Sequence, residues 1–326
     1  MRAWLLDRME GLSALRLGET AVPIPAAGEV VVDIELAALN PADRYLAEGQ
    51  YPGKPKMPHI LGRDAIGMVS ALGPGVTTVR VGDRRIFLRG EVGVNRAGTF
   101  AERVAVSADW LVEVPNGWSD AEAAGAALVY LTAYQALTQW GELPPSVVLV
   151  SGASGGVGVA TTQLASAMGH TVVALSRSEQ KSERLRQLGA TITLDPNTPD
   201  WPAQLKKQLA GRRVDLAVDN IGGPGFTQIL ETLGNHGRVS AVGRLAGPVP
   251  EFNTASLFFR RLKIGGVAVG SYTNVESQAT WGNIVKILAA ANAKPVVDRI
   301  FDFEQLPAAF ERLSQGPMGK LILRVK

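Results

Sequence analysis

Four glycines follow a short apolar run in the segment Val147–Gly158, which reads VVLVSGASGGVG. The apolar run predicts a buried strand, and the glycines predict a tight turn that leads into a helix. Such a turn presents backbone N–H groups at the positive end of the helix, where they bind phosphate oxygens. The segment therefore predicts a pyrophosphate-binding site, and a turn that only packs a helix on a sheet is the alternative.

The residues after this turn complete a strand, helix, strand unit. Small or apolar side chains recur at Val157, Ala160, Leu164 and Met168, which is the spacing of one helical face. A second apolar run, Thr171–Leu175, follows directly. Because the glycine spacing is GxxGxxG rather than the more familiar GxGxxG, the prediction of a dinucleotide site depends on this context.

The end of the second predicted strand indicates which dinucleotide binds. Sites for NAD place a carboxylate there to bond the ribose hydroxyls, whereas this chain has Ser176, Arg177 and, further on, Lys181. A hydroxyl, a guanidinium and an ammonium group can each bind a 2′-phosphate. We therefore expect NADPH as the cofactor, and the alternative is that Arg177 and Lys181 are ordinary surface residues.

The composition is that of a globular protein with two domains. Of the 326 residues, 46% are hydrophobic and 19% are charged, which provides enough apolar material for large cores. The 33 basic and 30 acidic side chains leave a net charge of +3 without a long basic stripe, so no nucleic-acid partner is expected. No stretch is long and apolar enough for a membrane span or a signal peptide, which predicts a cytoplasmic protein without membrane contact.

Cysteine is absent, and histidine occurs only at His59, His170 and His236. Disulfides, thiolate-bound zinc and a cysteine nucleophile are therefore excluded. No two histidines lie close together in the sequence, so no metal site is predicted.

The pattern of apolar runs changes near residue 119. Before it, short strand-like runs such as Val30–Leu36 alternate with glycine turns. Ser119 and Glu122 then have the spacing of a capping box at the start of a helix. Beyond them strands and helices alternate, which predicts an α/β fold with a doubly wound parallel sheet. The strands are expected at 146–151, 171–176, 191–194, 214–218, 237–242 and 264–269, the helices at 157–168, 179–188, 200–210, 284–291 and 306–313, and a closing strand at 320–325.

A series of short motifs runs through the chain in a fixed order. They are Leu39-Asn40-Pro41-Ala42-Asp43, Gly49-Gln50-Tyr51-Pro52, Leu61-Gly62-Arg63-Asp64-Ala65-Ile66-Gly67, Val81-Gly82-Asp83-Arg84, Gly98-Thr99-Phe100-Ala101-Glu102, Leu131-Thr132-Ala133-Tyr134, the glycine turn, Asp219-Asn220-Ile221-Gly222-Gly223 and Gly319-Lys320-Leu321. Together they resemble the medium-chain dehydrogenases/reductases, and within them the zinc-free, NADPH:quinone oxidoreductase-like branch. The resemblance covers essentially the whole chain.

This resemblance implies two domains. A GroES-like β-barrel catalytic domain would comprise residues 1–118 and 273–326, and a Rossmann dinucleotide-binding domain residues 119–272, with the active site between them. Zinc-dependent members of the family carry a cysteine near the position of Asn40 and Gly-His-Glu where this chain has Gly62-Arg63-Asp64. Reduction without a metal requires an acceptor that is already electron-poor, such as a quinone or an α,β-unsaturated carbonyl.

Tyr51 resembles the proton-donating tyrosine of the enoyl thioester reductases in this family. A phenol at that place can hydrogen-bond to an enolate oxygen or protonate the α-carbon. Asn40 is the neighbouring catalytic candidate, because its amide can hold the nicotinamide carboxamide or the substrate carbonyl. The alternative for Tyr51 is a side chain that only packs beside Pro52. Tyr45 and Tyr130 are further candidates for lining the pocket.

The resemblance also implies contacts to each part of the cofactor. Asn220 and Arg244 are alternatively surface loop residues. The implied contacts are Ser154, Gly155, Gly156 and Val157 with the pyrophosphate, Thr132 with the nicotinamide ribose, Asn220 at the mouth of the fourth strand, Val267 to Val269 with the carboxamide, and Gly243 and Arg244 with the adenosine or diphosphate.

Three functions are compatible with these residues. The leading prediction is an NADPH-dependent reductase that transfers hydride to a quinone or an α,β-unsaturated carbonyl without a metal. A 2-enoyl thioester reductase is the second, with Arg260, Arg261 and Lys263 as a basic patch for the phosphates of coenzyme A or an acyl carrier protein. The third is a non-catalytic NADPH-binding sensor. Family members often pair through the edge strand of the Rossmann sheet, so a homodimer through Ile264–Val269 is expected.

Overall fold

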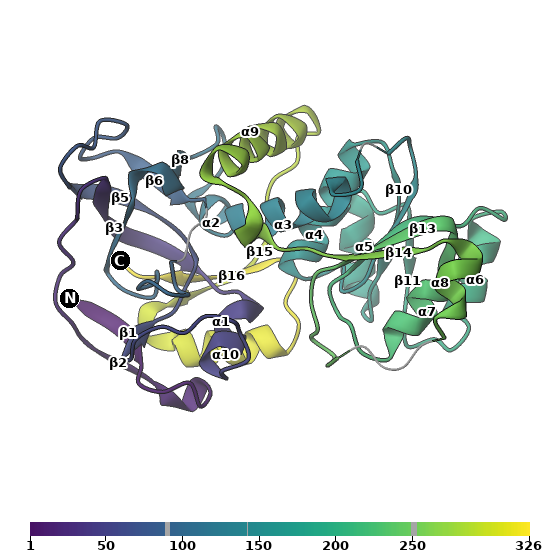
Figure 1. Cartoon of the computed structure of the whole chain (residues 1–326), viewed down its shortest axis with the longest axis horizontal. Helices are drawn as coiled ribbons and strands as arrows, with labels where there is room; N and C mark the ends of the chain where they lie inside the picture. Colours follow the sequence, from purple (N-terminus) through teal and green to yellow (C-terminus); the bar gives the residue numbers. More distant parts are fainter. Residues whose placement is uncertain (89–91, 142, 249–252) are drawn as a thin grey trace. The chain divides into compact units, whose positions relative to one another are not determined.

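The computed structural model describes residues 1–88, 92–141, 143–248 and 253–326. Its chain divides into two units, and Figure 1 labels the helices α1 to α10 and most of the strands. Unit 1 comprises Met1–Leu128, Tyr272–Trp281 and Lys294–Lys326, and unit 2 comprises Val129–Ser271 and Gly282–Ala293.

Unit 2 contains a six-stranded sheet in which every neighbouring pair of strands is parallel. The strand order is β11-β10-β9-β12-β13-β14, which is the order of a doubly wound dinucleotide-binding sheet. The chain reverses direction across the sheet at β9, so the carboxyl ends of β9 and β12 form the edge at which such sheets bind ligands. The strands are β9 (Val147–Val150), β10 (Thr171–Leu175), β11 (Ile192–Leu194), β12 (Val214–Asp219), β13 (Leu233–Ala241) and β14 (Lys263–Gly266).

Helices connect these strands, as parallel pairing requires. Trp201, at the start of α6, is buried in a core that also contains Leu149 and Phe226, and its Nε1 donates to Gln228. The helices wholly within unit 2 are α4 (Gly156–Ala167), α5 (Glu179–Gln187), α6 (Trp201–Gln208), α7 (Gly225–Thr232), α8 (Ala255–Arg260) and the short 3-10 helix η3 (Val269–Ser271). Two further helices begin in unit 1 and end in unit 2, α3 (Ala127–Thr138) and α9 (Asn274–Ala290).

Unit 1 contains a seven-stranded and a three-stranded sheet. The order is β15-β16-β3-β5-β6-β8 with β7 also paired to β3, and β2-β1-β4 in the smaller sheet. The strands are β1 (Arg2–Leu6), β2 (Leu15–Glu19), β3 (Glu29–Ala38), β4 (His59–Ile60), β5 (Asp64–Leu72), β6 (Arg84–Phe87), β7 (Arg103–Ser107), β8 (Leu111–Glu113), β15 (Val297–Asp302) and β16 (Lys320–Arg324). The helices are α1 (Pro41–Ala47), α2 (Asp120–Ala124), α10 (Leu306–Ser314) and the 3-10 helices η1 (Leu12–Ala14), η2 (Ala108–Trp110) and η4 (Phe303–Gln305).

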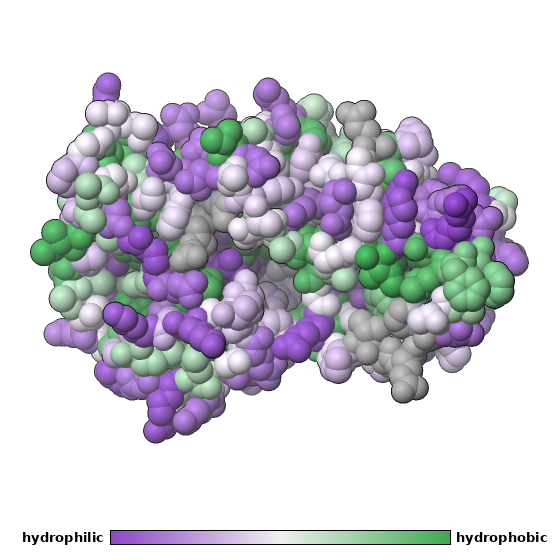
Figure 2. All heavy atoms as spheres, viewed as in Figure 1, coloured by the Kyte–Doolittle hydropathy of each residue, from purple (hydrophilic) through white to green (hydrophobic). Residues whose placement is uncertain are grey.

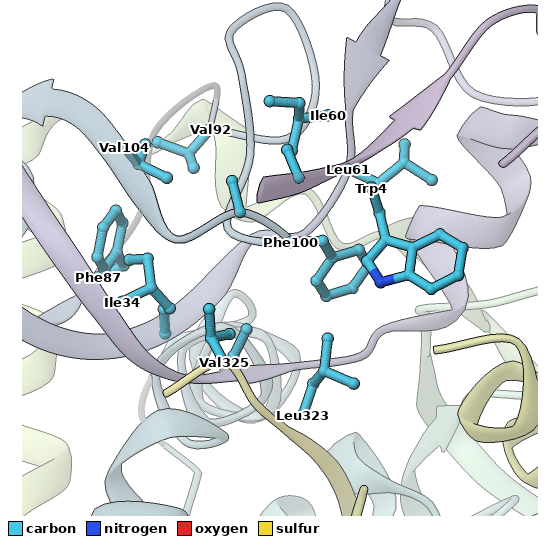
Figure 3. Packing of buried hydrophobic residues seen from close by; sticks show 14 of the residues in the cluster. Trp4, Ile34, Ile60, Leu61, Phe87, Val92, Phe100, Val104, Leu323 and Val325 are labelled. Atoms are coloured by element: carbon cyan, nitrogen blue, oxygen red, sulfur yellow. The ribbon is translucent and has the colours of Figure 1, made fainter. Parts of the chain in front are cut away.

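The core of unit 1 joins the N-terminal and C-terminal parts of the chain (Figure 3). Phe100 is fully buried and contacts Phe310 edge to face, with ring centroids 6.1 Å apart. Trp4 donates its indole N–H to the carbonyl oxygen of Phe303 over 2.9 Å. Burial of these aromatic side chains fixes the C-terminal segment in this unit.

The predicted α/β class and the predicted Rossmann sheet are confirmed. Ser119 and Glu122 form the predicted capping box at the start of α2. Beyond residue 119, the helices α7 and α8 and the strand β15 were not predicted. Strand β15 has no regular alternation of buried and exposed side chains, because two consecutive polar residues, Asp298 and Arg299, interrupt its apolar residues.

Several predicted boundaries were wrong; strand β13, for example, begins at Leu233 rather than Gly237. Helix α9 begins at Asn274 rather than Ile284, because Thr273 and Glu276 exchange capping hydrogen bonds at its start. Strand β14 ends at Gly266 rather than Val269, although Val267 N still donates to the carbonyl oxygen of Ala241 in β13. Residues from Val269 onwards turn into η3.

Candidate functional site

The glycine turn after β9 holds the N-terminus of α4 close to the sheet. Gly152 has a φ of +56°, which favours glycine, and a β-carbon there would lie 2.7 Å from Cδ1 of Ile221. A β-carbon at Gly158 would lie 2.3 Å from the carbonyl oxygen of Gly152 and 2.6 Å from Cα of Ala153. These two glycines therefore permit contacts that no larger residue would allow.

Gly155, in contrast, faces open space. A β-carbon there would have one neighbour within 4 Å, the carbonyl oxygen of Gly152 at 3.5 Å. Gly155 is the N-cap residue of α4, and within the described part of the chain no side chain caps that helix end. The first N–H groups of a helix without a side-chain cap need another acceptor, and a pyrophosphate supplies such acceptors. The predicted residues Ser154, Gly155, Gly156 and Val157 all lie at this turn, and each is partly exposed.

A buried carboxylate connects this turn to the loop after β12. Asp219 accepts hydrogen bonds from the Ser151 hydroxyl and from the backbone N–H groups of Ile221 and Gly222. Its own carbonyl oxygen accepts from the N–H groups of Val242 and Gly243. Asp219 thus organises three loops at the carboxyl edge of the sheet. Asp219 belongs to one of the sequence motifs, but no role was predicted for it; its position at the end of an apolar strand was the available signal.

Asn220 lies beside this carboxylate and is 8% exposed. Its Nδ2 donates to the carbonyl oxygen of Ser151 over 2.8 Å, which fixes the orientation of the amide. Its Oδ1 is buried and accepts no hydrogen bond from the described residues. A buried acceptor without a donor is costly, so this oxygen fits a ligand that carries a hydroxyl or amide donor. The N-terminus of α4 and the Asn220 amide therefore both fit a dinucleotide.

The residues predicted to recognise the 2′-phosphate lie at the end of β10 and the start of α5. Ser176 is 7% exposed and its hydroxyl donates to the carbonyl oxygen of Ser178. Arg177 is exposed, and within the described part of the chain it makes no ion pair. Lys181 is half-buried in the first turn of α5, where its backbone N–H is capped by the Ser178 hydroxyl.

The remaining predicted cofactor residues lie on three segments. Thr132 is half-buried in α3. Gly243 contacts the β12 loop closely, since a β-carbon there would lie 2.5 Å from the carbonyl oxygen of Asn220. Arg244, next in sequence, is exposed. Val267 is half-buried after β14, and Val269 is 8% exposed.

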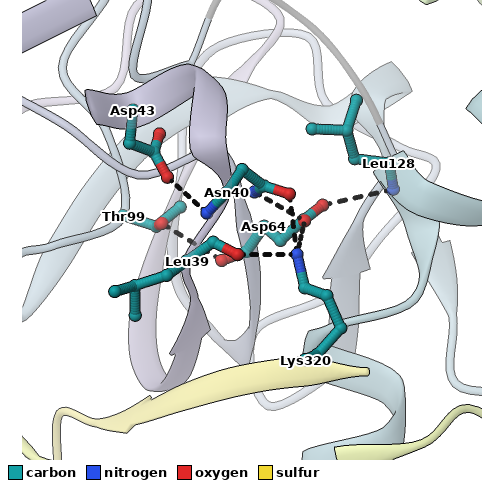
Figure 4. A network of polar contacts seen from close by, with 7 residues as sticks. All are labelled: Leu39, Asn40, Asp43, Asp64, Thr99, Leu128 and Lys320. Atoms are coloured by element: carbon teal, nitrogen blue, oxygen red, sulfur yellow. Dashed lines mark hydrogen bonds and ion pairs between the residues drawn. The ribbon is translucent and has the colours of Figure 1, made fainter. Parts of the chain in front are cut away.

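In unit 1, the Asn40 amide belongs to a buried polar network (Figure 4). Its Nδ2 donates to Asp64 over 3.0 Å, and its Oδ1 accepts from the ammonium group of Lys320 over 2.7 Å. Lys320 also pairs with Asp64 over 3.2 Å and donates to the carbonyl oxygen of Leu39. The Asn40 amide is therefore held by two charged side chains and keeps one N–H for another acceptor.

Asp43 lies next to this network at the start of α1. Its Oδ2 accepts from the backbone N–H of Asn40 over 2.8 Å, while its Oδ1 is buried and accepts no hydrogen bond from the described residues. Burial raises the pKa of Asp43 to about 6, although the positive charges of Arg63 and Lys320 act in the opposite direction. The hydrogen bonds and the ion pair of Asp43 and Asp64 are all made with groups of the fold itself.

The hydroxyl of Tyr51 meets a cation. Nη1 of Arg63 donates to Oη of Tyr51 over 3.0 Å, and both side chains are half-buried. The aromatic ring packs against the hydrophobic core of unit 1. Tyr130, which was a further pocket candidate, is instead a core residue: it is 1% exposed and its hydroxyl donates to Gln163.

The histidines are dispersed. Burial lowers the pKa of both His59 and His170, which favours their neutral forms. His170 is a buried acceptor for the backbone N–H of Ser146. Among the described residues no three His, Asp or Glu side chains form a group able to hold a metal ion. No helix in the same part of the chain has the length and apolarity needed to span a bilayer.

Two family models match the chain in the regions where these features lie. The model described as an alcohol dehydrogenase GroES-like domain matches residues 26–116, and the model described as a zinc-binding dehydrogenase matches residues 156–290. Quinone oxidoreductase of Rattus norvegicus is 30% identical over 328 residues, which cover 99% of this chain and 97% of the relative. This chain belongs to the medium-chain dehydrogenase/reductase family. Within that family it lies in the quinone oxidoreductase-like branch, and it is an oxidoreductase.

Solved structures of the family have the same fold. Quinone oxidoreductase of Escherichia coli, solved with NADPH, has a TM-score of 0.90 at 25% identity, and the match covers all of both chains. An NAD-dependent alcohol dehydrogenase has a TM-score of 0.92 at 30% identity, again over all of both chains. The relatives of this medium-chain dehydrogenase/reductase thus carry the names of both quinone reductases and alcohol dehydrogenases.

Proposed function

We propose that this medium-chain dehydrogenase/reductase is an NADPH-dependent reductase that transfers hydride to a quinone or an α,β-unsaturated carbonyl without a metal. The observation that carries the proposal is the N-terminus of α4 at Gly155, which no side chain of the described residues caps. The Oδ1 of Asn220 lies beside the same turn and accepts no hydrogen bond from those residues. When bound, NADPH supplies the hydride. The E. coli quinone oxidoreductase solved with NADPH supports this choice of cofactor.

The pyrophosphate would be held by Ser154, Gly155, Gly156 and Val157, and the 2′-phosphate by Ser176, Arg177 and Lys181. Thr132, Asn220, Val267 and Val269 would hold the nicotinamide half, and Gly243 and Arg244 the adenosine side. Arg177 is exposed and free of ion pairs within the described residues, so its charge is available to a 2′-phosphate.

Zinc-independent reduction is supported by the chemistry of the Asn40 network. The ammonium group of Lys320 lies 2.7 Å from the amide oxygen of Asn40 and 3.2 Å from the carboxylate of Asp64. A cation that already uses these oxygens opposes a metal ion at the same place. Tyr51 is the proposed proton donor, and Asn40 is the proposed contact for the substrate or nicotinamide carbonyl.

NADPH oxidation with three acceptors, measured side by side, tests the proposal: 1,2-naphthoquinone, a simple enal and crotonyl-CoA. We expect turnover with the quinone or the enal. Turnover with crotonyl-CoA alone would assign a thioester reductase, and no turnover with any acceptor would favour a cofactor sensor. Arg260 does not favour the thioester function, because its guanidinium donates to the carbonyl oxygens of Leu230 and Leu233.

Tyr51→Phe tests the proton donor. If the phenol protonates carbon, this substitution should slow enal reduction more than quinone reduction, because a hydroquinone oxygen exchanges protons readily with water. Equal and negligible effects on both reactions would exclude the role.

We also propose that the protein is a homodimer that pairs through β14. This strand is an edge of the unit 2 sheet, and Ile264 on it is 39% exposed. Phe258 and Phe259 of α8 are exposed beside it, and Figure 2 shows hydrophobic side chains gathered over this part of the surface. An apolar edge strand of this kind pairs readily with another strand.

A further inference from the structure

Arg63 is a half-buried cation that pairs with no carboxylate among the described residues. None of the salt bridges among the described residues includes it, whereas most other arginines of unit 1 pair with a carboxylate, as Arg103 does with Asp33. Asp43 acts on Arg63 only through its charge, because no hydrogen bond joins them. A partly desolvated cation in this condition favours an anion nearby.

The backbone on both sides of Arg63 is fixed. A β-carbon at Gly62 would lie 2.5 Å from Oγ1 of Thr99 and 2.7 Å from the Phe100 ring, and the φ of Gly62 is +97°. On the other side, Asp64 is held by Lys320, by Asn40 and by the backbone N–H of Leu128. The packing of these two neighbours therefore fixes the backbone of Arg63 and the point from which its side chain extends.

The hydrogen bond from Arg63 determines how Tyr51 can act. A guanidinium group only donates, so Oη of Tyr51 must accept in this 3.0 Å contact. The single phenolic proton then points away from Arg63 and can be given to another acceptor. If that proton leaves, the phenolate oxygen remains next to a positive charge.

We propose that Arg63 is a positioning residue of the reductase site, which orients the Tyr51 proton toward the acceptor and stabilises the negative charge that the reaction creates. The inference rests on the proposed function. Hydride addition to an enone breaks the carbon–carbon π bond and leaves the electron pair as an enolate. The proton of Tyr51 moves to the enolate, the phenolate keeps the negative charge beside Arg63, and water restores the phenol.

The test combines substitutions at both positions. Arg63→Met should lower kcat for an enal by about tenfold or more, the value of a charge-assisted hydrogen bond, while the KM for NADPH stays unchanged. Arg63→Lys should recover part of this loss, since it restores the charge. In the Tyr51→Phe background Arg63→Met should have almost no further effect. Full and independent effects of the two substitutions, or an unchanged kcat in Arg63→Met, would overturn the inference.

A binding measurement separates this inference from the proposed function. The probe is 4-nitrophenol, whose phenolate form has its own absorbance, titrated in the presence of NADP⁺. Wild-type protein should bind the phenolate about tenfold more tightly than Arg63→Met, because the oxyanion supplies a negative charge near the Arg63 guanidinium. Equal affinity of the two proteins would contradict the role of Arg63, even if the wild type reduces quinones. Arg103→Met, which removes a paired surface arginine of the same unit, is the matched control and should bind like the wild type.

Discussion

Arg177 is the side chain on which the proposed preference for NADPH over NADH mainly depends. It is exposed, and it follows a strand end where an NAD site would carry an acidic residue. Removal of its guanidinium should weaken the affinity for NADPH and leave that for NADH nearly unchanged, because only NADPH carries the 2′-phosphate.

The expected size follows from that chemistry. Arg177→Ala should lower the ratio of kcat/KM for NADPH to that for NADH by more than tenfold, about 1.4 kcal/mol. Arg184→Ala removes an equally exposed arginine whose guanidinium donates to Gln187, and it should leave the ratio unchanged. An unaltered ratio in Arg177→Ala would reject the assignment.

Asp43 makes stability depend on pH in an unusual direction. Burial raises its pKa from the ordinary 3.8 to about 6, so the folded protein keeps a proton that the unfolded chain has lost. The stability from this group is fully present below the unfolded pKa and is lost as pH rises through about 6, and it amounts to about 3 kcal/mol. Asp43→Asn cannot ionise but keeps an acceptor for the backbone N–H of Asn40. Its Tm relative to wild type should therefore rise between about pH 4 and about pH 7.

Asp298→Asn is the control with the opposite sign. Burial opposes ionisation of this carboxyl, but hydrogen bonds from Arg312 and Met318 still hold its pKa below the ordinary value. Its charged form therefore stabilises the fold at neutral pH, and the relative Tm of Asp298→Asn should fall as pH rises. A pH-independent Tm difference for Asp43→Asn would contradict the account of Asp43.

Two glycines at the start of α4 have different roles, since Gly158 is required for packing and Gly155 is proposed to contact the cofactor. Gly158 is needed for the contact of α4 with the turn, whereas Gly155 has room for a methyl group. Gly155→Ala should leave Tm unchanged and weaken NADPH binding by about tenfold or more, since its methyl group would enter the phosphate site. Gly158→Ala should lower Tm as well, because its β-carbon would overlap backbone atoms.

Gly225→Ala is the matched control for these two. Gly225 begins α7 in the same unit, and a β-carbon there would meet no atom within 4 Å. This variant should bind NADPH like the wild type. If Gly155→Ala also binds normally, the dinucleotide does not lie at the N-terminus of α4. Isothermal titration calorimetry with NADPH, together with thermal melts, gives both quantities.

The alternation of strands and helices after residue 119 was readable from the sequence because each buried parallel strand is a continuous apolar run. The elements that were missed have other signals. Helix α8 is short, with two adjacent exposed phenylalanines, so it has no helical apolar face, and β15 is recognisable only through its pairing with β16. Local patterns do not contain such long-range pairings.

The candidate site residues likewise divide into those that a sequence motif indicates and those that only the folded structure reveals. Asn40 and Tyr51 could be selected from their motifs, but their partners Lys320 and Arg63 could not, since the contact of Asn40 with Lys320 joins residues 280 positions apart. The role of Asp219 likewise depends on three loops that meet only in the folded sheet.

If the whole protein is a homodimer, its particle mass in solution has a defined value. Sedimentation should give about twice the 34.5 kDa of one chain. Ile264→Lys places a charge on the exposed edge strand β14 and should yield monomers. Ile300→Lys is the control, because Ile300 is 40% exposed on β15, an edge strand of the seven-stranded sheet in unit 1. A monomeric wild type, or a dimer that Ile264→Lys leaves intact, would contradict the pairing.

We propose that this protein transfers hydride from NADPH to an electron-poor acceptor without a metal. The most direct measurement follows NADPH consumption with 1,2-naphthoquinone by protein that has been treated with a chelator and whose zinc content is known. We expect zinc-free wild-type protein to consume one NADPH for each quinone that it reduces. Gly155→Ala should do the same only at a higher NADPH concentration. Failure of the zinc-free protein to consume NADPH, with activity restored in proportion to added zinc, would contradict the proposal.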